Sequence, residues 1–421
     1  MTRGLPACRS CGAHELELVL SLGRTPLANA LLTREQLTQP EPLYPLDLAF
    51  CPSCTLVQIT ETVPPADLFS EYLYFSSFSD TMLRHAQSLV LSLIAERRLG
   101  PRSLVVEVAS NDGYLLQYYQ QAGVPVLGIE PAANIASEAK KRGVPTIVEF
   151  FGQELAGQLR AKGQRADVIH VHNVLAHVAD LNGFVEGIKV LLKDDGVAVI
   201  EAPYVKDLID HCEFDTIYHE HLCYYSLTAL DRLFRRHDLF IQDVDRISIH
   251  GGSLRVTVGK SAQPALPQRG KEHVAQLLAE ETAWGVGRFA TYRHFGARVE
   301  ALKATLTSML AGFKRRGDRI AAYGAAAKGS TLLNYFGIGL ETLDFVVDRS
   351  PHKQGRFMPG VHIPIRAPER LLEEMPDEVL LLTWNFADEI LEQQKAYRQL
   401  GGRFIIPVPE VRVVADEEVA A

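Results

Sequence analysis

The sequence lacks the long apolar segments that a bilayer or a secretion signal requires. No window of about eighteen consecutive apolar residues occurs in the 421-residue chain, and the N-terminus has no apolar signal core. Basic residues form no long run, and the formal net charge at pH 7 is -8. These absences argue against a membrane, a secretory route or a nucleic acid as the main partner, and they predict a cytoplasmic protein.

Cysteine is also scarce, and its spacing is informative. Of the 6 cysteines, four form two C-x-x-C pairs, Cys8 with Cys11 and Cys51 with Cys54. Such pairs indicate a metal site in a reducing compartment, and neither pair shows the βαβ context of a redox motif. Four thiolates suit tetrahedral zinc and leave no open position, so a structural zinc in a ribbon-like domain is expected. The long insertion between the pairs carries a polar Asn29 that is expected to reach elsewhere.

The most informative stretch begins with an apolar, β-branched run, 104–108, which predicts a buried parallel strand. The turn-forming cluster 110–113 follows, and a helix is expected from Tyr114. A second short strand, 126–129, ends at Glu130, a carboxylate that can accept both hydroxyls of a ribose. Strand, turn and helix in this order open a nucleotide-binding α/β fold, with the ligand at the carboxyl end of the strand.

The absence of one glycine pattern limits which cofactor the turn can bind. The full G-x-G-x-x-G is absent, so nothing obvious cradles a pyrophosphate, and S-adenosylmethionine fits better than a dinucleotide. Asp112 and the turn amides are expected to hold its amino-acid end, and Glu130 its ribose. A structural unit without a ligand is the alternative. The aromatic segment 68–82 is expected to be a packed linker or a lid over the cofactor. The candidate cofactor contacts are Tyr72, Ser79, Glu107, Ser110, Asn111, Asp112, Gly113, Glu130, Pro131 and Asn173.

Strands and helices alternate through the middle of the chain, which predicts a doubly wound sheet. Further strands are expected at 146–151, 166–174 and 196–204, and two runs in 242–259 predict an antiparallel edge pair. A parallel sheet that ends in an antiparallel hairpin is typical of methyltransferase folds. The expected organisation is a zinc-binding domain (1–67), a methyltransferase domain (68–262), a helical connector (263–316) and a second α/β domain (317–421).

Tyr218-His219-Glu220-His221 follows the fifth predicted strand and therefore lies on the carboxyl side of the sheet. These side chains can supply a general base and its orienting carboxylate, and His177, just past the fourth strand, can face the same cavity. Zinc ligation is the rival interpretation, although the spacing is not the helical one of zinc proteases, and a structural histidine cluster is a further alternative. A histidine base with a tyrosine or histidine donor suits enolate formation and methyl transfer to carbon.

Seven motifs occur in a fixed order along the chain. They are Cys8/Cys11 with Cys51/Cys54, Glu107-Val-Ala-Ser-Asn-Asp-Gly113, Asn173-Val-Leu-Ala-His177-Val, Glu220-His221, His250-Gly-Gly-Ser-Leu-Arg255, Tyr323-Gly-Ala-Ala-Ala-Lys328-Gly and Lys353-Gln354 with Pro359-Gly360. Together they resemble one known family, the nucleotide-sugar C-methyltransferases of deoxysugar biosynthesis, and the resemblance covers nearly the whole chain.

The resemblance implies S-adenosylmethionine as methyl donor, a structural zinc, and a TDP-4-keto-deoxyhexose that is methylated at C-3′ (favoured) or C-5′. It further implies a monomer with the sugar between the middle and C-terminal domains. His221 is implied as the base, with Glu220, Tyr218 and His177 as supporting groups. An NAD-dependent nucleotide-sugar oxidoreductase is the alternative function. The candidate substrate-binding residues are Asn29, Tyr204, His250, Lys328 and Lys353, the two lysines for the diphosphate.

Overall fold

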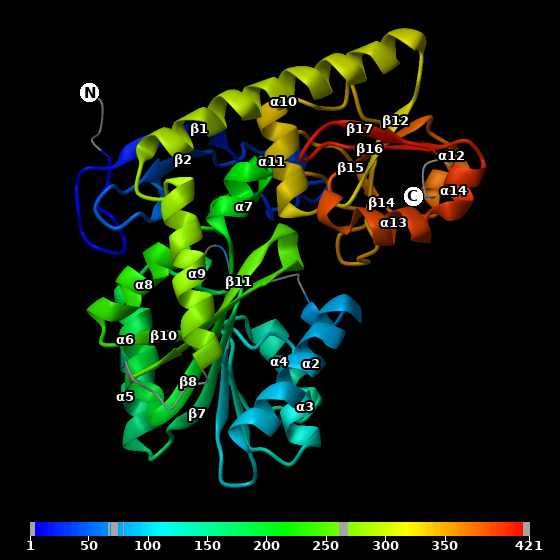
Figure 1. Cartoon of the computed structure of the whole chain (residues 1–421). Helices are drawn as coiled ribbons and strands as arrows, with labels where there is room; N and C mark the ends of the chain where they lie inside the picture. The colour runs from blue at the N-terminus through cyan, green and yellow to red at the C-terminus, as the bar shows by residue number, and fades with distance from the viewer. Residues whose placement is uncertain (1–4, 66–67, 69–74, 79, 261–267, 416–421) are drawn as a thin grey trace.

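Three β-sheets with helices packed around them make up the part of the chain that the computed structural model describes (Figure 1). The described residues are 5–65, 68, 75–78, 80–260 and 268–415. No helix within these ranges is both long and apolar enough to cross a membrane. Tyr72 and Ser79, two of the expected cofactor contacts, lie outside the described residues.

The N-terminal sheet is antiparallel and takes its last strand from far along the chain. Phe50 of this sheet stacks on Tyr292 of helix α10 (Phe289–Arg316), with the ring centroids 4.6 Å apart. The helix therefore covers the buried face of the sheet and continues toward the C-terminal sheet (Figure 1). The strand order is β1 (Glu17–Thr25), β2 (Tyr44–Phe50), β3 (Val57–Ile59) and β9 (Cys223–Tyr224).

The central sheet confirms the predicted doubly wound architecture. Its order is β10-β11-β8-β7-β4-β5-β6, in which β8 to β6 are parallel and the β10–β11 hairpin is antiparallel. All four residues of β4 are buried because α2 and α3 cover one face and α5 and α6 the other (Figure 1). The strands are β4 (Val105–Val108), β5 (Val126–Ile129), β6 (Thr146–Ile147), β7 (Ala166–His172), β8 (Leu192–Pro203), β10 (Phe240–Ile247) and β11 (Ser253–Gly259).

The C-terminal sheet has the order β14-β13-β12-β15-β16-β17, parallel except for β17, and it confirms the second α/β unit. Its first crossover helix is α11 (Ala327–Phe336). The strands are β12 (Ile320–Tyr323), β13 (Val346–Val347), β14 (Ile365–Arg366), β15 (Glu378–Leu381), β16 (Arg403–Ile406) and β17 (Arg412–Val414).

Three predicted elements differ in length. The strand expected at 146–151 is the two-residue β6, an edge strand that pairs only with the end of β5. The strand expected at 166–174 ends at His172, because Asn173 adopts a φ of 56°. The helical connector expected at 263–316 contains two helices, α9 (Gln268–Trp284) and α10, because Gly285 at φ 94° ends the first one.

The remaining helices pack on these sheets and on one another. They are α2 (Asp80–Arg97), α3 (Leu116–Gln121), α4 (Ala133–Lys141), α5 (Gln153–Ala161), α6 (Leu181–Leu191), α7 (Val205–Asp210), α8 (Leu227–Arg236), α12 (Arg370–Glu374), α13 (Ala387–Gln393) and α14 (Lys395–Gln399). Short 3-10 helices are η1 (Gln36–Thr38), η2 (Ser76–Phe78), η3 (Leu175–His177), η4 (Phe214–Thr216), η5 (Ile249–Gly251) and η6 (Trp384–Phe386).

A buried carboxylate joins the connector to the central unit. Glu281 of α9 is fully buried and accepts the backbone N–H groups of Leu227 and Thr228 at 2.6 and 2.8 Å, together with the Thr228 hydroxyl. These amides are the unpaired donors at the start of α8. An anion at this end also complements the helix dipole, so Glu281 stabilises α8 from outside its own chain segment.

We expect Glu281→Gln to lower the free energy of unfolding by about 1–3 kcal/mol, because it removes the charge from a buried, fully hydrogen-bonded group. Chemical denaturation would measure the change. The matched control is Glu280→Gln, which alters the exposed neighbour on the same helix and should stay within about 0.5 kcal/mol of the unsubstituted protein. Equal stability of the two variants would contradict the capping role.

Candidate active site

The turn after β4 has three left-handed residues at alternate positions. Ala109, Asn111 and Gly113 have φ angles of 51, 49 and 79°. A Cβ on Gly113 would lie 2.8 Å from Val144 Cγ2, so glycine is required there. Non-glycine residues rarely adopt this conformation, and such strain concentrates at ligand sites. Ala109 and Asn111 thus supply backbone geometry that a glycine pattern would otherwise provide.

Glu130, at the end of β5, is tied to this turn. Its carboxylate accepts the backbone N–H of Asn111 in the turn at 3.0 Å and that of Ala132, just past Pro131, at 2.9 Å. Burial raises the pKa of Glu130, and the two amide hydrogen bonds oppose the rise. Each carboxylate oxygen keeps a second lone pair, so the group can still accept ribose hydroxyls.

Two residues that the sequence did not single out close the turn from η2. The backbone N–H of Ser76 donates to Asn111 Oδ1 at 3.0 Å, and the Ser77 hydroxyl donates to Asp112 Oδ2. Asp112 is fully buried and also pairs with Arg142 at 3.1 Å. These contacts join segments at least thirty residues apart in the chain. Segment 68–82 was expected to be a packed linker or a lid over the cofactor, but no local pattern in the sequence indicated these particular contacts.

The other cofactor candidates lie in or next to the same edge of the sheet. Glu107 is buried, and this burial, with nearby carboxylates, raises its pKa well above the ordinary value, so the neutral acid is favoured. Ser110 lies against β5, where Gly128 leaves room for its hydroxyl: a Cβ on Gly128 would come within 2.5 Å of Ser110 Oγ. Asn173 ends β7 beside β4. The described candidates therefore gather at the carboxyl ends of β4, β5 and β7.

The loop at residues 213–222 carries the expected chemistry and is held from two other units. Trp384 of the C-terminal unit donates its indole N–H to Asp215 Oδ2 at 2.7 Å. His219 Nε2 donates to the backbone carbonyl of Pro45 in β2 at 3.1 Å. The loop is therefore fixed by contacts to the N-terminal and C-terminal sheets, and its position depends on both.

His221 has the geometry of a general base. Its Nδ1 lies 2.9 Å from the backbone carbonyl of Thr216, and its Nε2 lies 2.8 Å from the Tyr218 hydroxyl. A carbonyl only accepts, so Nδ1 carries the hydrogen and the neutral ring keeps its lone pair on Nε2. The Tyr218 hydroxyl donates to that lone pair. The reactive nitrogen of the candidate base, His221 Nε2, therefore already has a proton donor beside it, the Tyr218 hydroxyl.

His177 and Glu220 complete this cluster. The rings of His177 and His221 meet edge to face with centroids 4.8 Å apart, and burial lowers the pKa of His177 to about 4, so it is neutral at pH 7. Glu220 is buried, which raises its pKa to about 7, and it accepts a hydrogen bond from Asn29 Nδ2 at 2.7 Å. Tyr218, His177 and His221 thus lie together, and Glu220 adjoins His221 in the chain with its carboxylate bonded to Asn29. Within the described ranges, the histidines of the loop form no metal-ligand group.

The four paired cysteines converge on one point. Their sulfur atoms all lie within 4.8 Å of one another, with Cys8 to Cys54 at 3.5 Å and Cys11 to Cys51 at 3.6 Å. Tetrahedral zinc with bonds of about 2.3 Å places its sulfurs about 3.8 Å apart, so the set fits zinc. Donation from Cys54 lowers the pKa of Cys8 to about 5, whereas burial raises that of Cys51 to about 11. Only a bound cation would make all four thiolates stable together.

A cleft of about 710 Å³ separates the central and C-terminal units. This volume falls within the range of about 300–1,000 Å³ that is usual for ligand sites. The cleft has aromatic and basic lining residues, and Trp384 on its wall contacts the 213–222 loop. Its lining residues include His211, Arg246, Trp384, Phe386 and Arg412.

The expected substrate residues are not among the residues that line this cleft, although Lys328, Tyr204 and His250 neighbour residues that do. Lys328 is buried with Nζ 4.3 Å from the Trp384 ring centroid, and burial lowers its pKa while Asp215 and Glu213 oppose the shift. Lys353 donates to the Ala325 carbonyl at 2.8 Å. Two further candidates are placed by their neighbours: Tyr204 is buried beneath the Arg246 guanidinium, and His250 precedes Gly251 on the cleft wall, its side chain lying outside the described atoms.

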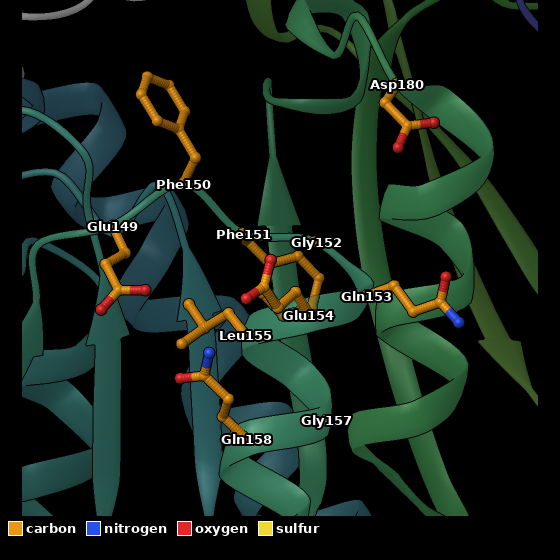
Figure 2. Close-up of a pocket in the computed structure, with 10 residues that line it drawn as sticks. All are labelled: Glu149, Phe150, Phe151, Gly152, Gln153, Glu154, Leu155, Gly157, Gln158 and Asp180. Atoms are coloured by element: carbon orange, nitrogen blue, oxygen red, sulfur yellow. The ribbon is translucent and has the colours of Figure 1, made fainter.

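A second cavity, of about 760 Å³, opens beside α5 (Figure 2). It begins at the loop after β6, where Phe150 is 53% exposed, and extends along the first turns of the helix to Asp180. Figure 2 shows the Phe150 ring pointing away from the helix. None of its lining residues was predicted for the site. The aromatic pair Phe150-Phe151 after β6 is visible in the sequence, but the sequence pattern does not show that Phe150 is exposed.

The sheet, the turn and the base cluster define a methyltransferase with a separate thiolate-zinc domain. Residues 8–69 match a family described as a zinc binding domain, 82–244 a methyltransferase domain, and 248–409 a C-methyltransferase C-terminal domain. The C-methyltransferase NovU of Streptomyces niveus is 37% identical over 417 residues, 99% of either chain. The chain therefore belongs to the C-methyltransferase family, and it is an S-adenosylmethionine-dependent enzyme with a zinc domain, as predicted.

Two solved structures resemble the methyltransferase part. The magnesium protoporphyrin IX methyltransferase of Synechocystis with bound SAM is 14% identical, with a TM-score of 0.33 over 42% of this chain and 79% of its own. A SAM-dependent methyltransferase of Anabaena variabilis is 14% identical, with a TM-score of 0.35 over 41% of this chain and 84% of its own. Similarity at this level supports no statement about activity.

We expect Cys51→Ser to reduce bound zinc below one ion per chain and to destabilise the protein by at least about 2 kcal/mol, because a structural zinc contributes folding free energy. Elemental analysis and thermal unfolding would measure both effects. Cys212→Ala is the control: this cysteine is also buried but lies outside the cluster, so zinc content should not change. Full zinc content in Cys51→Ser would remove it from the ligand set.

Proposed function

We propose that this enzyme transfers a methyl group from S-adenosylmethionine to the carbon next to the ketone of a TDP-4-keto-deoxyhexose, C-3′ in preference to C-5′. The observation that carries the proposal is the fixed tautomer of His221, whose Nε2 lone pair lies next to a phenol. Methylation at carbon needs a base that removes a C–H proton, and a donor for the resulting enolate oxygen. This pair supplies both.

The residues of the cluster take separate roles. Nε2 of His221 accepts the proton from the carbon, and the Tyr218 hydroxyl turns from Nε2 to donate to the enolate oxygen. Thr216 keeps Nδ1 protonated throughout. Neutral His177 packs against the His221 ring and excludes water, and Glu220 stabilises the imidazolium that forms. S-adenosylmethionine, held by the 109–113 turn and Glu130, supplies the electrophilic methyl group.

The cleft between the central and C-terminal units is proposed for the nucleotide sugar. Arg246 and Arg412 supply positive charge for a diphosphate, and Trp384 offers an aromatic face for a base. Trp384 also connects the cleft to the general base His221. Its hydrogen-bond partner Asp215 directly precedes Thr216, whose carbonyl accepts from the His221 ring. Lys328 and Lys353 stay proposed as further cations near the diphosphate. The proposal requires that the sugar ring of the bound nucleotide extends from the cleft to His221.

We further propose that the enzyme is a cytoplasmic monomer. The cofactor turn, the base and the cleft all come from one chain, so no second copy is needed to complete the site. Thiolate zinc also fits a reducing compartment. An NAD-dependent oxidoreductase is not favoured by the family matches. Incubation with TDP-4-keto-deoxyhexoses, with the new methyl located by NMR, tests the reaction, and the absence of a methylated product would exclude this acceptor.

We expect His221→Ala to bind S-adenosylhomocysteine normally and to lose turnover by at least ~100-fold, which is the usual effect of removing a general base. The variant should also fail to exchange the acidic C–H of the acceptor for deuterium in heavy water. His294→Ala, an exposed histidine on α10, is the control and should keep the full rate. Normal exchange in His221→Ala would assign the base elsewhere.

We expect Arg412→Ala to raise KM for the nucleotide sugar about tenfold, because it loses one charge-assisted contact to the diphosphate, with kcat within about twofold. Affinity for S-adenosylhomocysteine should not change. Steady-state kinetics and calorimetry with TDP would measure these effects, and Arg293→Ala, on the exposed side of α10, is the control. An unchanged KM would place the diphosphate outside this end of the cleft.

A further inference from the structure

The insertion of the N-terminal unit reaches the proposed base cluster. Asn29 lies between β1 and β2, and its Nδ2 donates to Glu220 Oε1 at 2.7 Å, across 191 residues of sequence. Glu220 is 4% exposed, whereas Asn29 is exposed, so the amide covers the carboxylate from the open side. Among the described residues, no hydrogen bond reaches the second oxygen, Oε2.

The insertion makes further contacts besides the one between Asn29 and Glu220. Its backbone pairs with the C-terminal unit at Leu32 and Phe357, with N···O distances of 3.0 and 2.9 Å. Further along, the Glu41 carboxylate accepts the backbone N–H of Gly360 at 2.9 Å and a hydrogen bond from His362. These contacts fasten the part of the insertion that follows Asn29 to the C-terminal unit, so the position of Asn29 depends on a unit other than the one that carries Glu220.

The electrostatic surroundings of Glu220 are simple. Burial raises its pKa to about 7, and the Asn29 hydrogen bond is the opposing influence. The titratable groups around it are the imidazoles of His219 and His221 in the same loop and of His177 from η3, whose ring bonds the Glu220 backbone carbonyl. No lysine, arginine or second carboxylate of the described chain shifts its pKa.

We propose that Asn29 is a positioning residue: it holds Oε1 of Glu220 so that the group is ionised beside His221, with Oε2 free to face the reacting centre. The role deepens the proposed function, because an ionised Glu220 stabilises the imidazolium that His221 becomes. The N-terminal unit therefore contributes to catalysis through one amide, in addition to its zinc. In this role Asn29 binds the Glu220 carboxylate and does not contact the substrate directly.

The test compares Asn29→Leu, which keeps the side-chain size, with Gln39→Leu, an exposed amide on the same insertion. The ionisation of Glu220 is followed by infrared difference titration against Glu220→Gln, which needs neither substrate nor turnover. A lost donor to a carboxylate raises its pKa, so the Glu220 midpoint in Asn29→Leu should rise by about one pH unit, and Gln39→Leu should leave it unchanged. An unmoved midpoint in Asn29→Leu would overturn the proposal.

Turnover provides a second readout. The acid limb of the kcat/KM profile should move to higher pH in Asn29→Leu, with a rate loss of about fivefold at pH 7 that largely disappears at pH 9. In the Glu220→Gln background, adding Asn29→Leu should cause no further shift. An equal loss at every pH would assign Asn29 to another role. If no TDP-4-keto sugar turns over even with the unsubstituted enzyme, the proposed function fails, and the infrared titration still decides the role of Asn29.

Discussion

The structure depends on one buried polar loop, residues 213–222. Its polar groups are shielded from water and therefore need hydrogen-bond partners within the protein. A buried polar group without a partner costs about 1–3 kcal/mol, so a loop rich in acids and histidines can be buried only where other segments meet it. Asn29 meets Glu220 from the N-terminal unit, and Trp384 meets Asp215 from the C-terminal unit. The three sheets are thus required together, because each one alone leaves part of this loop unpaired.

The cofactor turn follows a different principle, in which strain is accepted locally and offset by neighbours. Ala109 and Asn111 are held in a conformation that their side chains disfavour. Glu130 and Ser76 compensate by bonding the Asn111 backbone and side chain. A turn fixed in this way needs little rearrangement when its ligand arrives, so less binding free energy is lost to ordering.

Features that depend on neighbouring residues in the sequence were predictable. Contacts between residues far apart in the chain were not. The apolar run of β4, the paired cysteines and the closeness of Tyr218 to His221 follow from periodicity and spacing. The contact of Asn29 with Glu220 was not foreseen, because it joins two units whose relative placement is set by the whole core. The break at Gly285 was also missed, since a single glycine ends a helix only when its carbonyls find other partners.

The short strand β9 has a consequence for the order in which the protein is made. The N-terminal sheet takes its fourth strand from Cys223–Tyr224, which pairs with β3. The ribosome must therefore synthesise more than half of the 421 residues before the first sheet in the chain can be completed. During that interval the edge of β3 is exposed while the central sheet is still growing. All four cysteines of the zinc cluster therefore leave the ribosome well before the strand that completes the neighbouring sheet.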